Sequence, residues 1–380
     1  MSDVLVYVQH LLGIGHVRRM ALINEALRAQ GLHVTVASGG IAHSDLDFAA
    51  DDVIALSPCK TSDTGFSTLV DADGNVLGKE WQDKRKSQLL SAFEATSPKL
   101  LLVEMFPFGR RAFRFELIPL FDAAKEANLP IVCSVRDLLV RKKDIRKTEW
   151  MRDIARKYLD AVLVHGDPNL FGFDRSFEFT DDISDLISYT GYVAPKMDSN
   201  DLSGGQAQRQ GLLVSAGGGA VGAKLISLAI EARSHSKRFC SSIWNIVTGP
   251  HFPQDQLEQL GKQLPDGVVL HRFLPDFRER MAGAEVSVSQ AGYNTLMDVL
   301  ATQTPAVMVP FAENGESEQT ERAKILEKEG VISLLDLDGL SAQSLAKQID
   351  NAKRPSGINI ALDGAEKTAL IIAGKIKGKV

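Results

Sequence analysis

Residues 285–310 read EVSVSQAGYNTLMDVLATQTPAVMVP, and this stretch decides the class of fold. A β-prone run at 285–289 leads through small polar residues into a helical run at 295–301, and a second β-prone run follows at 306–309. Strands that alternate with helices in this way are typical of α/β proteins with a parallel sheet. The stretch therefore predicts two parallel strands that are joined by a crossover helix.

The same alternation continues along the rest of the chain. In the N-terminal half the apolar runs do not alternate strictly with polar residues, which is typical of strands that are buried on both faces. The sequence predicts an α/β protein with two Rossmann-like, doubly wound parallel-sheet domains, whose ligands bind at the carboxyl ends of the strands. The other predicted strands are 4–9, 33–37, 100–104, 131–134, 161–164, 211–215, 242–247, 268–270 and 331–334, and the other predicted helices are 16–30, 111–127, 141–157, 221–233, 254–264 and 318–329.

A polar stretch that contains glycine and serine, PKMDSNDLSGGQAQR at 195–209, separates the two halves and is typical of an interdomain linker. We therefore predict an N-terminal domain at 1–194, a C-terminal domain at 210–358, and a last helical segment at 359–380 that packs back on the first domain. The length of 380 residues fits two domains of ordinary size. We expect the two domains to face each other across a cleft.

The bulk composition narrows the classes of function. Apolar residues make up 44% and charged residues 24%, which is typical of a folded globular chain, and the net charge of −5 argues against general nucleic-acid binding. The three cysteines are far apart, so neither a zinc site nor a disulfide framework is expected. We find no signal peptide and no apolar run of the roughly 20 residues that span a bilayer, and therefore expect a cytoplasmic protein with at most peripheral membrane contact.

Two glycine-rich loops, Gly13–His16 and Gly217–Gly222, follow predicted strands and open helices. Backbone N–H groups at such positions can bind phosphate, although a plain tight turn has the same sequence. The second loop fits the GxGxxG pattern, but the next strand ends without the acidic residue that holds the ribose in NAD enzymes. We therefore take Gly15, Gly218 and Gly219 as candidates for phosphate contacts.

His16 stands at a helix start in the first glycine loop, where a general base is often placed. A neutral imidazole could take a proton from an acceptor hydroxyl if a carboxylate oriented its other nitrogen. Glu104, at the end of the predicted strand 100–104, and Asp137 are the candidates for this partner. A structural histidine, and acids that serve as caps or surface charges, are the alternative interpretation.

The opening stretch also holds the candidate donor site. Gly292, Asn294 and Thr295 place hydrogen-bond donors at a helix N-terminus, where a diphosphate is stabilised, and Asp298 can accept ribose hydroxyls one turn later. Gln290 ends the preceding strand. Further along, Glu318 and Gln319 begin a helix and can bind vicinal sugar hydroxyls, and a charged, solvated helix face is the alternative interpretation.

These motifs together resemble the C-terminal domain of glycosyltransferase family 28, which includes the enzyme that adds N-acetylglucosamine to lipid I. The shared pattern is a Phe-led stretch at 273–277, Ser-x-x-Gly-x-x-Thr-x-x-Asp at 289–298, a proline-bounded strand at 305–310, and Glu-Gln-x-x-Arg-Ala at 318–323. More narrowly, EMFPFGRR at 104–111 and the HGDP run that begins at His165 resemble a poorly characterised bacterial branch of predicted glycosyltransferases.

The resemblance implies a GT-B fold and an inverting transfer by direct displacement, with no metal and no cofactor. It implies that Phe273 and Leu274 frame a uracil, Asp298 holds the ribose, residues 292–295 hold the diphosphate, and Glu318 and Gln319 hold the sugar. In the second glycine loop Ala220 stands where the family commonly has serine, so one phosphate contact is expected to be backbone-only or lost.

The acceptor side is marked by the run MFPFGRRAFRF at 105–115, which mixes aromatics with Arg110 and Arg111. A second basic cluster lies at 141–147. Either cluster could bind an acidic, phosphorylated or lipid-linked acceptor, or rest on an anionic membrane. Core aromatics with solvated cations are the alternative.

We therefore expect an inverting transferase that moves a sugar from a UDP-sugar to a hydroxyl acceptor, with no nucleic-acid partner. Three Asp-x-Asp runs, at 45–47, 71–73 and 336–338, are interpreted as turns and not as metal sites. The alternatives are a nucleotide-sugar 2-epimerase on the same fold, whose typical first loop differs from Gly13–His16, and a non-catalytic nucleotide-sugar-binding protein.

Overall fold

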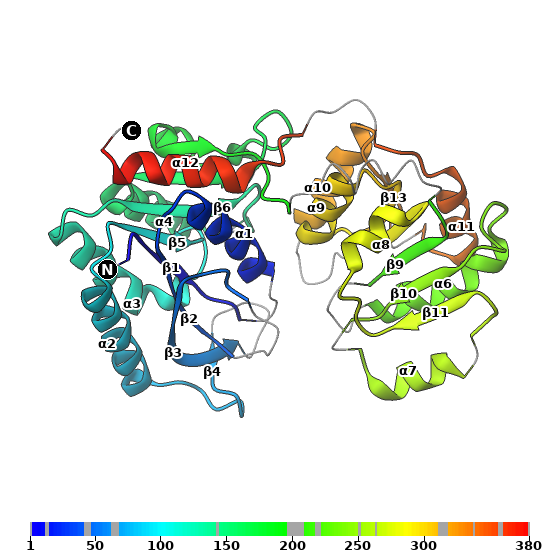
Figure 1. Cartoon of the computed structure of the whole chain (residues 1–380), viewed down its shortest axis with the longest axis horizontal. Coiled ribbons are helices and arrows are strands. Elements are labelled where there is room, and N and C mark those ends of the chain that lie inside the picture. Colours follow the sequence, from blue (N-terminus) through cyan, green and yellow to red (C-terminus); the bar gives the residue numbers. More distant parts are fainter. Residues whose placement is uncertain are drawn as a thin grey trace. The chain divides into compact units, whose positions relative to one another are not determined.

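The computed structural model describes residues 2–11, 15–41, 47–61, 68–141, 144–195, 209–216, 222–249, 252–262, 264–310, 318–336, 339–355 and 360–378. The chain forms two compact units (Figure 1). Unit 1 consists of Met1–Ala194 and Ala361–Val380, and unit 2 consists of Pro195–Ile360. Most of the predicted linker, residues 196–208, lies outside the described residues.

Unit 1 is built on an eight-stranded sheet with the order β4-β3-β2-β1-β5-β6-β7-β8. All neighbours pair in parallel except β3 and β4, which are antiparallel. The strand order reverses between β1 and β5, and ligands of doubly wound sheets bind at such a switch point. The strands are β1 Val4–Val8, β2 Val34–Gly40, β3 Asp52–Thr61, β4 Leu69–Val70, β5 Leu100–Glu104, β6 Ile131–Arg136, β7 Ala161–His165 and β8 Ile187–Tyr189.

Helices cover both faces of this sheet, because successive side chains of its strands point to opposite sides. Val4, Val6 and Val8 of β1 join the core beneath α1 and α12, whereas Leu5 and Tyr7 join the core beneath α2, α3 and α4. The helices are α1 Gly15–Ala29, α2 Lys79–Thr96, α3 Arg114–Glu126, α4 Ile145–Tyr158 and α12 Gly364–Ile376, with the short 3₁₀ helices η1 Arg111–Phe113, η2 Phe173–Arg175 and η3 Asp181–Leu186.

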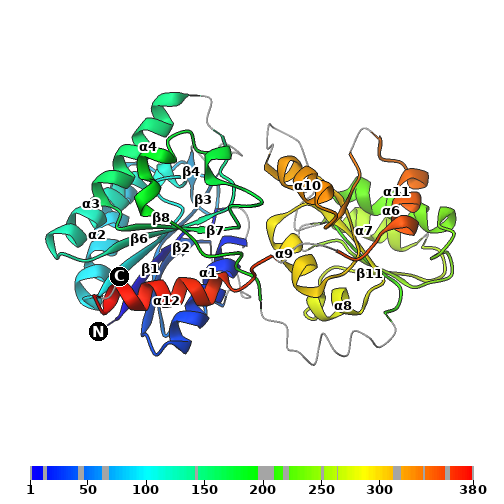
Figure 2. The same cartoon turned by 90° about the horizontal axis from the view of Figure 1, so that it is seen from above.

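The last helix, α12, belongs to unit 1 although unit 2 precedes it in the chain. It lies along α1 (Figure 2), and Ala365, Ala369 and Ile372 pack in the same buried cluster as the apolar face of α1. Where the chain re-enters unit 1, Tyr192 N–H donates to Ala361 O at 2.8 Å. The two segments that connect the units are therefore joined at their unit 1 ends.

Unit 2 is a fully parallel six-stranded sheet with the order β11-β10-β9-β12-β13-β14, whose switch point lies between β9 and β12. The stretch 285–310 forms β12, α9 and β13, and β12 pairs in parallel with β13, so the predicted strand–helix–strand unit is confirmed. The elements are β9 Leu212–Ser215, α6 Ala223–His235, β10 Trp244–Val247, α7 Gln254–Gly261, β11 Val268–His271, α8 Phe277–Gly283, β12 Val286–Gln290, α9 Tyr293–Thr302, β13 Ala306–Val309, α10 Glu318–Lys328, β14 Ser333–Leu334 and α11 Ala342–Asn351.

Candidate functional site

His16 and Glu104 meet at the switch point of unit 1. His16 is the second residue of α1, the helix that follows β1, and Glu104 ends the neighbouring strand β5. Their closest atoms, His16 Nδ1 and Glu104 Oε1, are 2.5 Å apart. Of the two acids that the sequence offered as partners, Glu104 is thus the one that contacts His16. Asp137 is fully buried after β6, where its Oδ1 accepts from the backbone N–H of Leu138 at 2.9 Å.

Glu104 is fully buried and is surrounded by positive charge. The same Oε1 that faces His16 accepts from Arg19 Nη2 at 2.5 Å, and Arg110 Nη2 lies 3.6 Å from Oε2. Burial would raise the pKa of this carboxyl, but His16 and the two arginines outweigh it and hold the pKa well below its usual range. Glu104 is therefore an ionised carboxylate at neutral pH.

His16 is neutral in this environment. Burial lowers its pKa to about 4, against the opposing effect of Glu104, and the charges of Arg110 and Arg19 lower it further. Because an ionised carboxylate can only accept, Nδ1 carries the proton toward Glu104, and the lone pair lies on Nε2. The side chain is 24% exposed, and the unprotonated nitrogen of a neutral imidazole can accept a proton.

The predicted acceptor-side arginines have different neighbours. Arg110 adopts a left-handed backbone conformation, with φ of 58°, directly before η1, and it faces Glu104. Arg111 places its guanidinium over the ring of Trp150, 5.2 Å from the ring centroid. The structure thus brings Arg110, but not Arg111, into ion-pair contact with Glu104. The middle of the second basic cluster, residues 142–143, lies outside the described residues.

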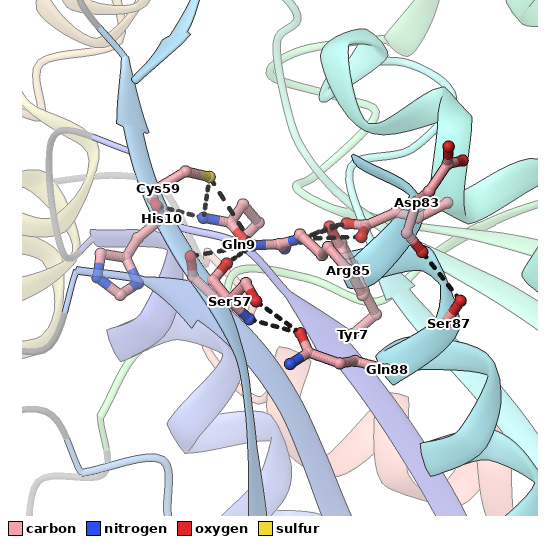
Figure 3. A network of polar contacts seen from close by, with 11 residues as sticks. Tyr7, Gln9, His10, Ser57, Cys59, Asp83, Arg85, Ser87 and Gln88 are labelled. Carbon is pink, nitrogen blue, oxygen red and sulfur yellow. Dashed lines mark hydrogen bonds and ion pairs between the residues drawn. The ribbon is translucent and has the colours of Figure 1, made fainter. Parts of the chain in front are cut away.

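A second buried ion pair in unit 1 joins Arg85 of α2 to Glu116 of α3, and both side chains are fully buried. Arg85 Nε donates to both carboxylate oxygens, at 3.0 and 2.8 Å, and Tyr7 Oη donates to Oε1 at 2.6 Å. The rest of the guanidinium bonds to Gln9 Oε1 at 2.6 Å and to the carbonyl of Ser57 at 2.7 Å (Figure 3). This network ties α2 and α3 to the ends of β1 and the middle of β3.

The predicted donor residues of unit 2 gather at its switch point. Gln290 ends β12, Gly292 is the N-cap of α9 with an extended backbone, and Asn294 and Thr295 lie half-buried in the first turn. The next turn carries Asp298, which is 16% exposed. These residues follow the strand that borders β9, where a doubly wound sheet binds its ligand.

Asp298 has a partner that the sequence did not reveal. Arg278 of α8 places Nε 3.0 Å from Asp298 Oδ1. The ion pair fixes the carboxylate near the start of α9. In the sequence Arg278 stands in a charged run, RER at 278–280, and is not distinguishable from a solvated helix cation.

Other predicted donor contacts separate into exposed and buried groups. Phe273 is 57% exposed, which suits a ring that stacks on a base, whereas Leu274 is buried. Gln319 lies in the first turn of α10, and within the described part of the chain its Oε1 is buried without a hydrogen-bond partner. Arg322, one turn later, lies over the ring of Tyr293, so the start of α10 adjoins the start of α9.

Some predictions fall outside the described residues: Gly218, Gly219, Ala220 and the side chain of Glu318. Gly15 is the first residue of α1. Gly222 begins the turn into α6, and a Cβ there would lie 2.0 Å from the Cβ of Ala216. Only glycine fits such a close approach of helix and strand, which is one role of the last glycine in a GxGxxG loop.

Among the described residues, no group of three or more His, Cys, Asp or Glu side chains is placed to hold a metal ion. The Asp-x-Asp run at 71–73 is a turn, because Asp71 Oδ1 accepts from the backbone N–H of Asp73 at 3.0 Å and of Asn75 at 2.8 Å. The other two runs lie partly outside the described residues. Over the part of the chain that the structure covers, no helix has the length and apolar character to cross a membrane.

Comparison with known proteins agrees with this architecture. Residues 213–367 match the family described as "Glycosyltransferase family 28 C-terminal domain". A UDP-N-acetylglucosamine--N-acetylmuramyl-(pentapeptide) pyrophosphoryl-undecaprenol N-acetylglucosamine transferase from Natranaerobius thermophilus is 30% identical over 25% of this chain and 26% of its own length. The enzyme of the same name from Yersinia pestis is 24% identical over 56% of this chain and 55% of its own length.

Solved structures extend the similarity to the whole chain. The glycotransferase of kitacinnamycin has a TM-score of 0.63 at 14% identity and covers 99% of this chain and 97% of its own. MurG of Acinetobacter baumannii has a TM-score of 0.58 at 13% identity, covering 97% of this chain and 94% of its own. The chain therefore has the GT-B fold. Within that fold, residues 213–367 are similar to the family 28 C-terminal domain.

Proposed function

We propose that the protein is an inverting glycosyltransferase that moves a sugar from a UDP-sugar to a hydroxyl group of an acceptor. The observation that carries the proposal is the His16–Glu104 pair at the switch point of unit 1. It occurs in a chain whose other unit carries a family 28 C-terminal domain. This chain covers about a quarter of the length of one of these curated relatives and about half of the length of the other. The names of both relatives describe N-acetylglucosamine transfer.

In the proposed reaction, Nε2 of His16 takes the proton of the acceptor hydroxyl. The hydroxyl oxygen forms a bond to the anomeric carbon, the bond from that carbon to the diphosphate oxygen breaks, and UDP leaves with the electron pair. A single displacement of this kind inverts the anomeric centre. Glu104 keeps the proton of the imidazole on Nδ1 and stabilises the imidazolium that forms, as the carboxylate of a His–acid pair does.

For unit 2 we propose donor binding. The start of α9, at Gly292, Asn294 and Thr295, would hold the diphosphate, since a helix N-terminus stabilises an anion and its unpaired N–H groups donate to it. Asp298, held by Arg278, would accept from the ribose hydroxyls. Phe273 would stack on the uracil, and the buried Oε1 of Gln319 would accept from a sugar hydroxyl. We propose that no metal or cofactor is needed.

Isothermal titration with UDP tests this assignment. We expect wild-type protein to bind UDP, and Asp298→Ala to raise Kd by about tenfold, which corresponds to about 1.4 kcal/mol. Asp276→Ala is the matched control, because Asp276 also pairs with an arginine of α8, Arg280, but is exposed. Failure of the wild-type protein to bind UDP, or an equal loss in both variants, would overturn the donor site.

A further inference from the structure

The cluster around Glu104 carries more positive than negative charge. Arg19 and Arg110 both face this carboxylate, so two guanidinium groups are set against one carboxylate, and His16 is neutral. Arg136, at the end of β6, adds its charge to the field that acts on Arg110. Buried charge in a protein is normally balanced, because an uncompensated ion loses its hydration without gaining a partner.

Arg110 is the member of the cluster with the fewest bonds. Its side chain is only 10% exposed, yet among the described residues its sole ion pair is the 3.6 Å contact with Glu104 Oε2. Its Nε is buried without a hydrogen bond, and so is Glu104 Oε2. A guanidinium has five N–H donors, and a buried donor without a partner loses its hydration without compensation.

The backbone holds Arg110 in this place. Both Met105 and Arg110 have positive φ, at 67° and 58°, and the loop between them is closed by a bond from Gly109 N–H to Met105 O at 2.7 Å. Phe113 N–H then donates to Arg110 O at 2.8 Å and starts η1. Left-handed backbone at a residue with a side chain is unfavourable, and it persists where the surroundings fix it, often at ligand sites.

We propose that Arg110 forms an anion subsite beside His16, and that it receives an acidic group, a phosphate or a carboxylate, that the acceptor carries near its reacting hydroxyl. The inference rests on the proposed function for the identity of the ligand as an acceptor. A tetrahedral phosphate or planar carboxylate can accept two parallel hydrogen bonds from the guanidinium fork. The acceptor anion would then balance the excess charge and use the free donors of Arg110.

The subsite also couples acceptor binding to the strength of the base. Burial, Arg110 and Arg19 lower the pKa of His16, whereas Glu104 raises it, and these are the leading influences on the ring. An anion bound at Arg110 cancels one of the lowering charges, so the imidazole becomes a stronger base when the acceptor is present. An acceptor without the acidic group would bind next to a weaker base.

The test uses the full chain with ¹⁵N-labelled histidine, in which the His16 signals are assigned by their loss in His16→Gln. The pH midpoint of His16 is measured by NMR without added anion, with inorganic phosphate, and in a separate arm with acetate, over the pH range in which circular dichroism shows folded protein. We expect phosphate to raise the midpoint saturably by about one pH unit, the lower end of the effect of a nearby charge. A response to acetate as well would assign the subsite to oxyanions in general, and a response to phosphate alone to phosphoryl groups.

Arg110→Gln should raise the midpoint without any anion and remove the response to phosphate. Arg110→Lys, which keeps the positive charge but not the forked guanidinium, replaces Arg110→Gln if that variant does not fold. We expect Arg110→Lys to raise the phosphate concentration that gives half of the maximal shift by at least severalfold. Arg114→Gln is the matched control, since Arg114 is an exposed arginine of the same segment, and it should respond as the wild type does. An absent phosphate response in the wild type, or an equal response in Arg110→Gln, overturns the proposal.

The measurement needs neither donor nor turnover, so its failure is distinguishable from failure of the transferase assignment. A protein that shows the phosphate response but does not bind UDP keeps the anion subsite and loses the proposed function. A protein that binds UDP but shows no phosphate response keeps the donor site and loses the anion subsite.

Discussion

Glu104 and Glu116 are two fully buried carboxylates of the same unit, and each faces arginine, yet their surroundings differ. Both oxygens of Glu116 accept short bonds, and every terminal nitrogen of its partner Arg85 also donates to the protein. Glu104 has both of its close contacts on one oxygen, and its other oxygen has no hydrogen bond in the described structure. The Arg85–Glu116 pair is fully hydrogen-bonded and balanced in charge. The Glu104 cluster has unused hydrogen-bonding atoms and includes a partly exposed histidine, His16.

The difference distinguishes an ion pair that stabilises the fold from one that can take part in a functional site. A buried ion pair whose bonds are all made orders the elements that meet there and has no capacity for a ligand. A buried carboxylate with an unused oxygen, an under-bonded arginine and a neutral imidazole can take part in binding and proton transfer. Burial and an arginine partner alone would have marked both glutamates as candidates.

The largest expected effect is on the Glu104 side. His16→Ala should lower the rate of UDP release from a UDP-sugar by about 10²–10⁴-fold, because the acceptor proton then has no base. His33→Ala, which removes an exposed histidine of the same unit, should leave the rate within about twofold. The rate is followed by a coupled assay for UDP. Full turnover in His16→Ala would remove His16 as the base.

On the Glu116 side the expected effect is on stability. Arg85→Met should lower the free energy of unfolding by about 3–5 kcal/mol, because it leaves a buried carboxylate without its counter-charge. The double variant Arg85→Met/Glu116→Leu should recover part of that loss. Urea unfolding, followed by circular dichroism, gives both values. A single variant that costs less than about 1 kcal/mol would contradict a structural role for this pair.

A smaller effect should appear in the pH dependence of stability. The pKa of His16 is about 4 in the folded protein and about 6.5 in an unfolded chain. Between these values the unfolded chain binds a proton that the folded protein does not, so stability falls as pH is lowered from about 6.5 to about 4. The slope is at most about 1.4 kcal/mol per pH unit. Urea unfolding gives the free energy of unfolding of the wild type and of His16→Gln at each pH in this range. The two plots of free energy against pH should differ by that slope, and parallel plots would show that His16 is not held neutral.

Much of the fold could be predicted from sequence, because parallel strands buried on both faces are apolar runs that need no alternation. Helix α2, Lys79–Thr96, was missed, and so was strand β3. The buried side of α2 includes Arg85, so its apolar stripe is interrupted by a charge that only the three-dimensional network explains. In β3 the Ser57-Pro58 pair interrupts the β-prone run.

Candidate site residues could be chosen from the sequence where the signal is local, and not where their neighbours depend on folding. The glycine loop before His16 and the motif around Gly292 are local signals. The choice between Glu104 and Asp137 is not local, because Glu104 ends β5, Asp137 follows β6, and only the switch point brings one of them to His16. Arg19 was also missed, although its position one turn after His16 on α1 could have indicated a shared partner.

The return of α12 to unit 1 has a consequence for how the chain is made. Synthesis proceeds from the N-terminus, so unit 2 emerges from the ribosome before the helix that covers α1. That face of α1, which carries Val17, Met20 and Ile23, therefore lacks its final packing partner until residues 364–376 have been translated. In topological terms unit 2 is an insertion within unit 1, and a stand-alone unit 1 would have to carry α12 joined by a short linker to Ala194.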